Sequence, residues 1–270
     1  MVRRIGFIGA GTIGAAMIRT IIGSGFSSAS VIYASDVENE KLMQLKRETG
    51  INICPDNATL AAGSDVIVIA VKPQLVKKVV GDIKAELEGK MIITIAAGIP
   101  IKIYEDILGH SRRIFRAMPN LPLLVGEGMT LIACKDGSDS DDMEFCKSFF
   151  KNFGRVEEMD ESLLSTVISL TASSPAYVFL LIESIATSVV RSGIPVNMAY
   201  RIIAQTILGS AKMLLESGEE HDRLVDELNE ELESETGGVE PYNKDKIRKA
   251  LMEAVDACNQ KALLFEKISE

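Results

Sequence analysis

The stretch Ile5–Gly14, which reads IGFIGAGTIG, decides the fold of this 270-residue chain. Its first four residues, Ile5–Ile8, are mostly apolar and predict a short buried strand. Three glycines follow at Gly9, Gly11 and Gly14 in the pattern G-x-G-x-x-G. The segment after them places its apolar side chains on one helical face. A strand, a glycine turn and an amphipathic helix in this order predict a site that binds a dinucleotide.

The glycines have different physical roles in such a site. Gly9 permits a tight turn, Gly11 has no Cβ and lets a pyrophosphate approach the backbone, and Gly14 lets the helix pack closely on the strand. The N-terminus of the helix offers free N–H groups and a partial positive charge to the phosphates. The cofactor site is therefore assigned to Gly9, Gly11, Thr12, Ile13 and Gly14.

Short apolar runs and helical stretches alternate through the first half of the chain. One run, Val66–Val71, is apolar without alternation, as expected of a parallel strand that is covered on both faces. The alternation predicts an α/β fold with a doubly wound parallel sheet of the Rossmann type. The expected strands are Ile5–Ile8, Val31–Ala34, Ile51–Ile53, Val66–Val71, Met91–Ile95 and Ile114–Ala117, with Gly128–Ala133 and Arg155–Glu157 as further candidates at the far edge. The expected helices between them are Ile13–Ser24, Asn39–Thr49, Thr59–Ala62 and Leu75–Glu88.

The pattern changes near residue 160, after which no strand-like run recurs. We predict a dinucleotide-binding domain over residues 1–160 and an all-α domain over residues 161–270. The uncharged run Leu163–Ile182 predicts a pair of buried helices with a break at Pro175. The long helices expected in the second domain are Ala176–Ser192, Val196–Ser217 and Lys244–Lys267.

Composition excludes several classes of function. A formal net charge of −9 and the absence of a basic run argue against a nucleic acid or a membrane surface as partner. With only two histidines, His110 and His221, no metal site is expected. The four cysteines are scattered without a C-x-x-C pair, which favours free thiols in a reducing cytoplasm.

The choice between NAD and NADP depends on the end of the second strand. An acidic residue there, Asp36, would hold the ribose diol of NAD and repel a 2′-phosphate. If Ser35 ends the strand instead, its hydroxyl could donate to a 2′-phosphate while Asp36 turns away as a helix cap. The residues by themselves leave both alternatives open.

Several short motifs occur in order along almost the whole chain. They are Gly6–Gly11 (GFIGAG), Ala70–Gln74 (AVKPQ), Ile95–Ile99 (IAAGI), Arg116–Pro122 (RAMPNLP), Ser174–Phe179 (SPAYVF) and Ala204–Gly218 (AQTILGSAKMLLESG). On these motifs the chain resembles the pyrroline-5-carboxylate reductases, the enzymes that make proline. The resemblance implies NAD(P)H-dependent reduction of L-1-pyrroline-5-carboxylate to L-proline, by hydride transfer to the imine carbon.

The resemblance also implies the cofactor contacts. Ala70 and Lys72 would line the cofactor ribose, with Pro73 in the same segment. Asn57 matches a family asparagine that faces the adenosine ribose or its 2′-phosphate, and together with Ser35 it favours NADPH, with NADH as the alternative. Small residues would leave room for the nicotinamide at Ala97 and Gly98.

The residues assigned to the reaction come from two segments. Met118, Pro119 and Asn120 would form the floor beneath the nicotinamide. Thr171 and Ser173 would help to bind the substrate carboxylate. The resemblance further implies a homodimer or a higher homo-oligomer with the active site completed across the interface.

The chain departs from the family pattern in two places. Ala172 and Ser174 add bulk near the expected substrate pocket. The family loop Ser-Pro-Gly-Gly-Thr-Thr, which cradles the substrate carboxylate, aligns without gaps with the acidic segment Glu230–Glu235 (EELESE). Two alternatives therefore remain beside the leading hypothesis: a reductase of a different imine, and a non-catalytic homologue that binds a dinucleotide.

Overall fold

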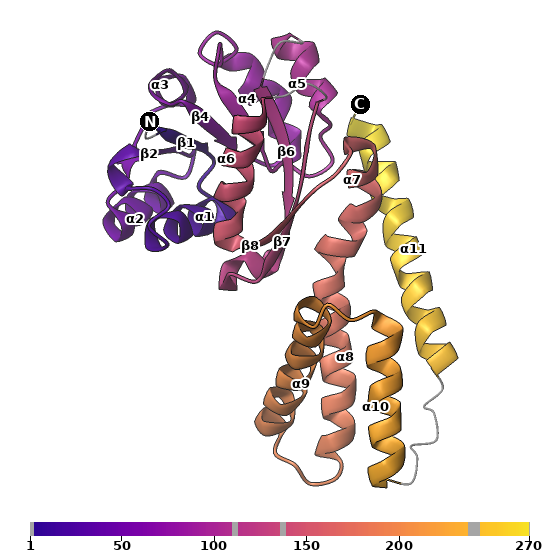
Figure 1. Cartoon of the computed structure of the whole chain (residues 1–270). Coiled ribbons are helices and arrows are strands. Elements are labelled where there is room, and N and C mark those ends of the chain that lie inside the picture. Colours follow the sequence, from indigo (N-terminus) through magenta and orange to yellow (C-terminus); the bar gives the residue numbers. More distant parts are fainter. Residues whose placement is uncertain (1–2, 110–112, 136–138, 237–243, 270) are drawn as a thin grey trace. The chain divides into compact units, whose positions relative to one another are not determined.

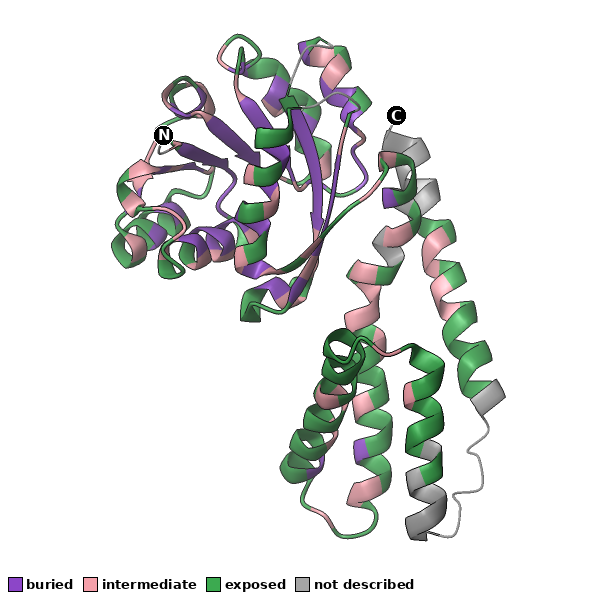
Figure 2. Cartoon of the chain, in the orientation of Figure 1, coloured by how far each residue is buried: buried purple, intermediate pink, exposed green. Residues whose placement is uncertain are grey.

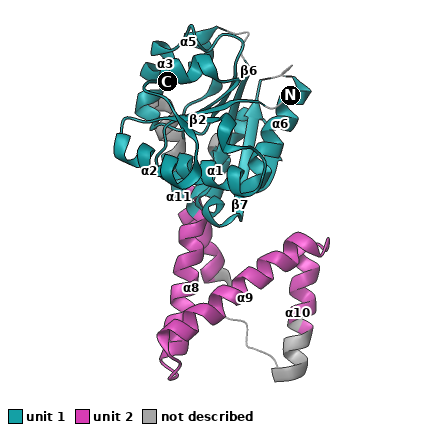
Figure 3. Cartoon of the chain, turned by 90° about the vertical axis from the view of Figure 1, so that its left-hand side faces the viewer, with its two compact units in different colours: residues 1–173, 257–270 teal, residues 174–256 magenta. Residues whose placement is uncertain are grey.

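The computed structural model describes residues 3–109, 113–135, 139–236 and 244–269 (Figure 1). It divides into two compact units, one made of residues 1–173 with 257–270 and the other of residues 174–256 (Figure 3). The predicted fold class is confirmed: a mostly parallel sheet with helices on both faces is followed by a helical region.

The strands of the first unit form one sheet. They are β1 (Ile5–Ile8), β2 (Ile32–Ser35), β3 (Asn52–Ile53), β4 (Val66–Ile69), β5 (Met91–Thr94), β6 (Arg113–Pro119), β7 (Gly128–Cys134) and β8 (Gly154–Glu158). Their order in the sheet is β3-β2-β1-β4-β5-β6-β7-β8. All neighbouring strands are parallel except β6 and β7, which are antiparallel. The two candidate strands at the far edge are therefore real, as β7 and β8.

The helices extend the predicted set. They are α1 (Thr12–Gly23), α2 (Asn39–Thr49), α3 (Asn57–Gly63), α4 (Val76–Asp82), α5 (Ile101–Leu108), α6 (Ser140–Phe150), α7 (Glu161–Ile168), α8 (Ser174–Val190), α9 (Val196–Glu216), α10 (His221–Thr236) and α11 (Lys244–Ser269). The helix expected over Leu75–Glu88 is shorter, because α4 ends at Asp82 and single turns follow it. Gly81 disfavours continuation of the helix, while Ile83 and Leu87 still pack into the core.

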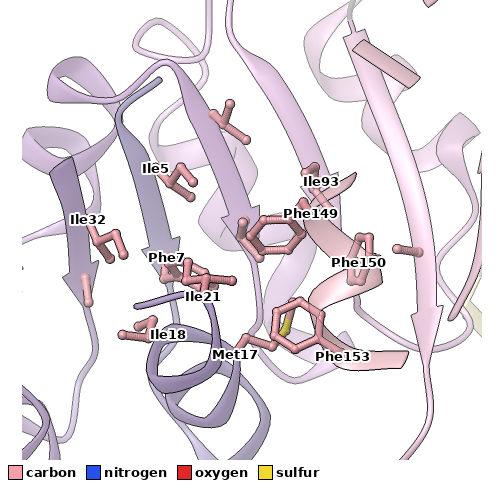
Figure 4. Packing of buried hydrophobic residues seen from close by; sticks show 14 of the residues in the cluster. Ile5, Phe7, Met17, Ile18, Ile21, Ile32, Ile93, Phe149, Phe150 and Phe153 are labelled. Atoms are coloured by element: carbon pink, nitrogen blue, oxygen red, sulfur yellow. The ribbon is translucent and has the colours of Figure 1, made fainter. Parts of the chain in front are cut away.

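Each face of the sheet has its own core. Helices α1, α2 and α6 cover one face and α3, α4 and α5 cover the other. The first core contains a cluster of aromatic rings, in which Phe149 lies 5.0 Å from Phe150, 5.5 Å from Phe153 and 6.3 Å from Phe7 between ring centroids (Figure 4). Burial of each such ring stabilises the fold by about 1.5–3 kcal/mol. The contact with Phe7 holds α6 against β1, the strand that leads into the glycine turn.

Most of the described residues in helices α8, α9 and α10 are exposed (Figure 2). Many of the exposed side chains are apolar. Helix α8 packs on α9, yet Phe179 is 65% exposed and Leu180 is 60% exposed. Leu170–Val190 is long and apolar enough to cross a membrane by length and composition, and 6% of its apolar window is buried. The prediction of a buried helix pair is thus wrong for the single chain, since the described residues leave these side chains exposed.

Pro175 does not separate two helices as predicted. It lies in the first turn of α8, and the preceding turn, Ser169–Ser173, is a π-helix. A proline has no N–H to donate to the carbonyl four residues earlier. The chain accommodates this missing hydrogen bond by widening one turn, a feature that is frequent at functional sites.

Candidate functional site

The carboxyl ends of the parallel strands lie at one edge of the sheet. Ile8 pairs with Ser35 on one side and Ile69 on the other, and Thr94 pairs with Ile69 and Arg116. The chain turns in opposite directions from β1 and β4, which makes a crevice of the kind that binds ligands in such sheets. The predicted cofactor residues lie at or after the carboxyl ends of β1, β2, β3, β4 and β5, so the fold brings them to this edge of the sheet, the cofactor edge.

The glycine turn has the geometry that a dinucleotide requires. Gly9 has φ +100°, and a Cβ built on it would lie 2.6 Å from the carbonyl oxygen of Ala70. A Cβ on Gly14 would lie 2.4 Å from the carbonyl oxygen of Gly9. A Cβ on Gly11 would meet nothing within 4 Å. Two glycines are therefore required by close backbone packing, whereas Gly11, at the N-terminus of α1, borders open space that a pyrophosphate can occupy.

Asp36 does not turn away from the glycine turn, as one of the two alternatives for the end of the second strand assumed. Its carboxylate is half-buried and accepts hydrogen bonds from the backbone N–H of Ala10 at 2.6 Å and of Glu38 at 2.8 Å. The first contact lies in the glycine turn itself, where the N–H groups attract a negative charge. The residue therefore joins the end of β2 to the glycine turn.

Ser35 and Asn57 form a pair at the same edge. Ser35 is buried, and its hydroxyl donates to Oδ1 of Asn57 at 2.7 Å. Asn57 begins α3 directly after Asp56, whose carboxylate accepts from the N–H of Thr59. Because its Oδ1 is already used, the Asn57 side chain presents its amide N–H groups. The predicted role of Ser35 as a direct donor to phosphate stays a prediction, and the geometry favours Asn57 as the donor that Ser35 orients.

The segments after β4 and β5 complete the cofactor edge. Ala70 donates its N–H to Ile8, and Lys72 is exposed immediately before Pro73 begins a turn of 3-10 helix. After β5, Ala97 is exposed and Gly98 has φ +71°. An exposed alanine followed by a glycine in a left-handed conformation leaves room for a planar ring next to the backbone.

The segment at the end of β6 is tied to the π-helical turn. Asn120 accepts a hydrogen bond from the N–H of Met129 at 2.8 Å and donates through Nδ2 to the carbonyl oxygen of Thr171 at 3.1 Å. This is the carbonyl to which Pro175 cannot donate. Met118 is buried and Pro119 is half-buried beside Asn120. The structure therefore brings Met118, Pro119, Asn120 and Thr171 together, although they are far apart in the sequence.

Ser173 lies in the same π-helical turn, where its hydroxyl contacts the Cys258 thiol at 3.4 Å. Among the residues that the structure describes, no hydrogen bond joins Ser173 to the residues predicted to lie next to the nicotinamide. The acidic segment Glu230–Glu235 belongs to α10, and Glu230 is exposed. The side chains of Glu231, Glu233 and Glu235 lie outside the described residues.

A cavity of about 760 Å³ lies between α5, α6 and the end of β8. Its lining includes Lys135 paired with Glu105 and Lys147 paired with Glu158, each at 2.7 Å. None of the predicted site residues lines it. Within the described part of the chain, no group of three or more His, Cys, Asp or Glu side chains could hold a metal ion.

Comparison with known proteins identifies the family. The family model "NADP oxidoreductase coenzyme F420-dependent" matches residues 4–98, and the model "Pyrroline-5-carboxylate reductase dimerisation" matches residues 161–264. A pyrroline-5-carboxylate reductase of Methanosarcina acetivorans is 35% identical over 261 residues, which are 96% of this chain and 97% of the relative. The chain belongs to the pyrroline-5-carboxylate reductase family.

Solved structures of the same family agree over nearly the full length. The pyrroline-5-carboxylate reductase of Coxiella burnetii is 27% identical with a TM-score of 0.90, covering 98% of this chain and 99% of that one. The pyrroline carboxylate reductase of Plasmodium falciparum, solved with NADP bound, is 28% identical with a TM-score of 0.83 and covers 98% of each chain. The predicted resemblance to pyrroline-5-carboxylate reductases is therefore confirmed.

Proposed function

We propose that this chain reduces L-1-pyrroline-5-carboxylate to L-proline with NADPH. The observation that carries the proposal is the family likeness over the whole chain, together with the open space at Gly11. In the reaction, NADPH supplies a hydride to the imine carbon, the nitrogen takes up a proton, and NADP⁺ is released. The protein itself then has to bind and orient NADPH and the substrate and to exclude water from them. Its sequence, which offers no obvious nucleophile–base pair, agrees with this role.

The residues at the carboxyl ends of the parallel strands bind different parts of NADPH and the substrate in this proposal. The N–H groups of Gly11, Thr12 and Ile13 hold the pyrophosphate at the N-terminus of α1. Asn57, oriented by Ser35, donates to the adenosine ribose or its 2′-phosphate. The residues next to the nicotinamide are Ala97, Gly98, Met118, Pro119 and Asn120, and the substrate carboxylate is held by the turn that contains Thr171 and Ser173.

The proposal is tested by NADPH consumption with and without L-1-pyrroline-5-carboxylate, with proline measured as the product. We expect consumption that depends on this substrate. An enzyme that oxidises NADPH with a cyclic imine lacking a carboxylate, and not with pyrroline-5-carboxylate, would favour a different natural substrate. The observation behind this second candidate is the acidic segment Glu230–Glu235.

The acidic segment Glu230–Glu235 can be tested for an effect on substrate binding. If Glu230, Glu231, Glu233 and Glu235 point away from the substrate, their replacement by glutamine changes KM for pyrroline-5-carboxylate by less than about threefold. A single acid about 4 Å from the substrate carboxylate would instead oppose binding by about 4 kcal/mol at an effective dielectric constant near 20. A KM that falls about a hundredfold or more in the quadruple variant would show that the acids face the site.

A second prediction concerns Asp36 and the choice of cofactor. Asp36→Asn keeps an oxygen to accept from Ala10 and removes the negative charge near the expected 2′-phosphate. We expect kcat/KM with NADPH to rise about tenfold and kcat/KM with NADH to change less than about twofold, because only NADPH carries the extra phosphate. Glu38→Gln, which removes a neighbouring exposed charge paired with Lys41, is the matched control. An unchanged ratio of the two efficiencies would exclude Asp36 as a determinant.

The dimerisation-domain match supports a homo-oligomer. We propose an intertwined dimer whose exposed α8 and α9 side chains are covered by a second copy. Phe179→Glu is expected to yield a monomer in light scattering and to lower activity, because the charge would have to be buried in the interface. Val37→Glu, at an apolar side chain of the first unit that is 97% exposed, is the control that should leave the oligomer intact. A wild-type chain that is a stable monomer at micromolar concentration would overturn the dimer.

Three further proposals concern the domain boundary, the cellular location and the partners of the protein. A domain boundary near residue 160, with residues 1–160 and 161–270 as the two domains, is supported by the family match that begins at residue 161. A cytoplasmic location is supported by the four cysteines, which are thiols rather than disulfides. The family likeness supports a small-molecule imine as partner, and the net charge of −9 argues against nucleic acid or a membrane surface.

A further inference from the structure

The loop between β5 and α5, residues 95–100, is held at its start by a buried hydroxyl. Thr94 is fully buried at the end of β5, and its Oγ1 accepts from the N–H of Ala96 at 3.3 Å. The hydroxyl of Tyr104, which is also fully buried, lies 2.5 Å from the same oxygen. Burial raises the pKa of Tyr104, so this phenol keeps its proton and remains a hydrogen-bonding partner.

The end of the loop is held by a carboxylate that is distant in the sequence. Oε1 of Glu161 accepts from the N–H of Ile101 at 2.7 Å and from Nη1 of Arg116 at 3.1 Å. The residue before Ile101 is Pro100, whose side chain cannot cap a helix. Glu161 therefore supplies the acidic cap that the first turn of α5 lacks locally.

Thr94 and Glu161 are the two anchors of the loop; Thr94 is fully buried, whereas the Glu161 side chain is 28% exposed and pairs with the buried Arg116. Thr94 and Arg116 are paired positions of the parallel strands β5 and β6, so their side chains leave the same face of the sheet. Arg116 is 1% exposed, which makes its pairing with Glu161 difficult to replace. Between the two anchors the loop turns through Ala97, which is exposed, and Gly98, which has φ +71°.

We propose that Thr94 and Glu161 are positioning residues, which fix the backbone of Ala97 and Gly98 next to the place of the nicotinamide ring. This inference rests on the proposed function, because it concerns the same cofactor edge. The glycine turn and Asn57 hold the other half of the dinucleotide. A shift of the 95–100 loop therefore alters the distance between the nicotinamide and the imine carbon, and with it kcat, while the Kd for NADPH changes little. Misplacement by about 1 Å can lower a rate by about a hundredfold.

The test for Thr94 uses two variants that distinguish a displaced 95–100 loop from a loss of folding stability. Thr94→Val/Tyr104→Phe replaces both hydroxyls by apolar groups of similar shape, so that no buried hydroxyl is left without a partner. Tyr104→Phe alone keeps the Thr94 oxygen that Ala96 uses. We expect the double variant to lower kcat about tenfold or more and the single variant to lower it less than about threefold. The Kd for NADPH, measured by its fluorescence on binding, should change less than about threefold in both.

The test for Glu161 uses Glu161→Leu and Glu161→Gln. The first removes the acceptor for Ile101, whereas the second keeps an oxygen and should retain more of kcat. Glu105→Leu is the matched control, because it removes another acid of the same helix, one that pairs with Lys135. Melting temperature is measured for every variant, so that a loss of kcat is compared only between variants of equal stability.

Amide hydrogen exchange supplies a readout that does not depend on turnover. We expect faster exchange at Ala96 in Thr94→Val/Tyr104→Phe and at Ile101 in Glu161→Leu, each by about tenfold or more, since each amide loses its acceptor. Equal kcat in Tyr104→Phe and the double variant, or a Kd for NADPH that rises as much as kcat falls, would overturn the positioning role. A wild-type protein that shows no turnover of pyrroline-5-carboxylate would overturn the proposed function instead, and the exchange measurements would still test the anchors.

Discussion

Gly11→Val is expected to abolish NADPH binding and to leave the fold intact. Gly11 has φ −65° and ψ −167°, a conformation that valine adopts without strain, and apart from the adjoining backbone no atom lies within 4 Å of the position of its Cβ. The fold therefore tolerates the side chain. The isopropyl group would, however, occupy the space next to the N-terminus of α1 that the pyrophosphate needs. We expect the Kd for NADPH in a calorimetric titration to rise about a hundredfold or more. The reason is that the pyrophosphate would lose its hydrogen bonds to the N–H groups at the N-terminus of α1, and a hundredfold change in Kd corresponds to about 3 kcal/mol.

Gly14→Val provides the contrast to this variant. A side chain at Gly14 would clash with the carbonyl of Gly9 at 2.4 Å, so this variant should lose stability rather than binding alone. Circular dichroism and melting temperature distinguish the two effects. Binding of NADPH to Gly11→Val with wild-type affinity would show that the glycine turn is not the pyrophosphate site.

Asn120→Asp is expected to lower kcat/KM about a hundredfold. The substitution keeps an oxygen that accepts from Met129, but it replaces the Nδ2 donor by an oxygen that faces the carbonyl of Thr171. Two acceptors at about 3 Å repel each other, and one hydrogen bond worth about 1–3 kcal/mol in a buried setting is lost. The floor beneath the nicotinamide and the π-helical turn would then separate. Steady-state kinetics with both substrates, together with the melting temperature, measure this effect.

Asn152→Asp is the matched control for this prediction. Asn152 also donates through Nδ2 to backbone carbonyls, those of Ser148 and Phe149, and accepts through Oδ1 from Ser24, but it lies outside the predicted site. It should reduce activity by less than about threefold. If Asn120→Asp has no larger effect on kcat/KM than this control, the link between Asn120 and Thr171 does not contribute to the reaction.

Local sequence was sufficient to predict the elements whose formation depends on near neighbours. The apolar run Val66–Ile69 forms a buried parallel strand, and the helix Asn39–Thr49 has the bounds that its pattern predicts. The different roles of Gly9, Gly11 and Gly14 follow from one local motif, and the structure shows the backbone contacts that those roles require. Helix α5 is absent from the predicted set, because Pro100 stands at its N-cap position and supplies no capping side chain. The cap comes from Glu161.

The sequence by itself thus determined the alternating sheet, the glycine turn at its edge and the family to which the chain belongs. Only the tertiary structure decided where Asp36 points, that the hydroxyl of Ser35 is used by Asn57, and that Asn120 reaches Thr171. The physical reason is the range of the interactions. Propensity and periodicity act over a few residues along the chain, whereas a hydrogen bond between residues far apart in the sequence exists only after the strands have been brought into register at one edge of the sheet.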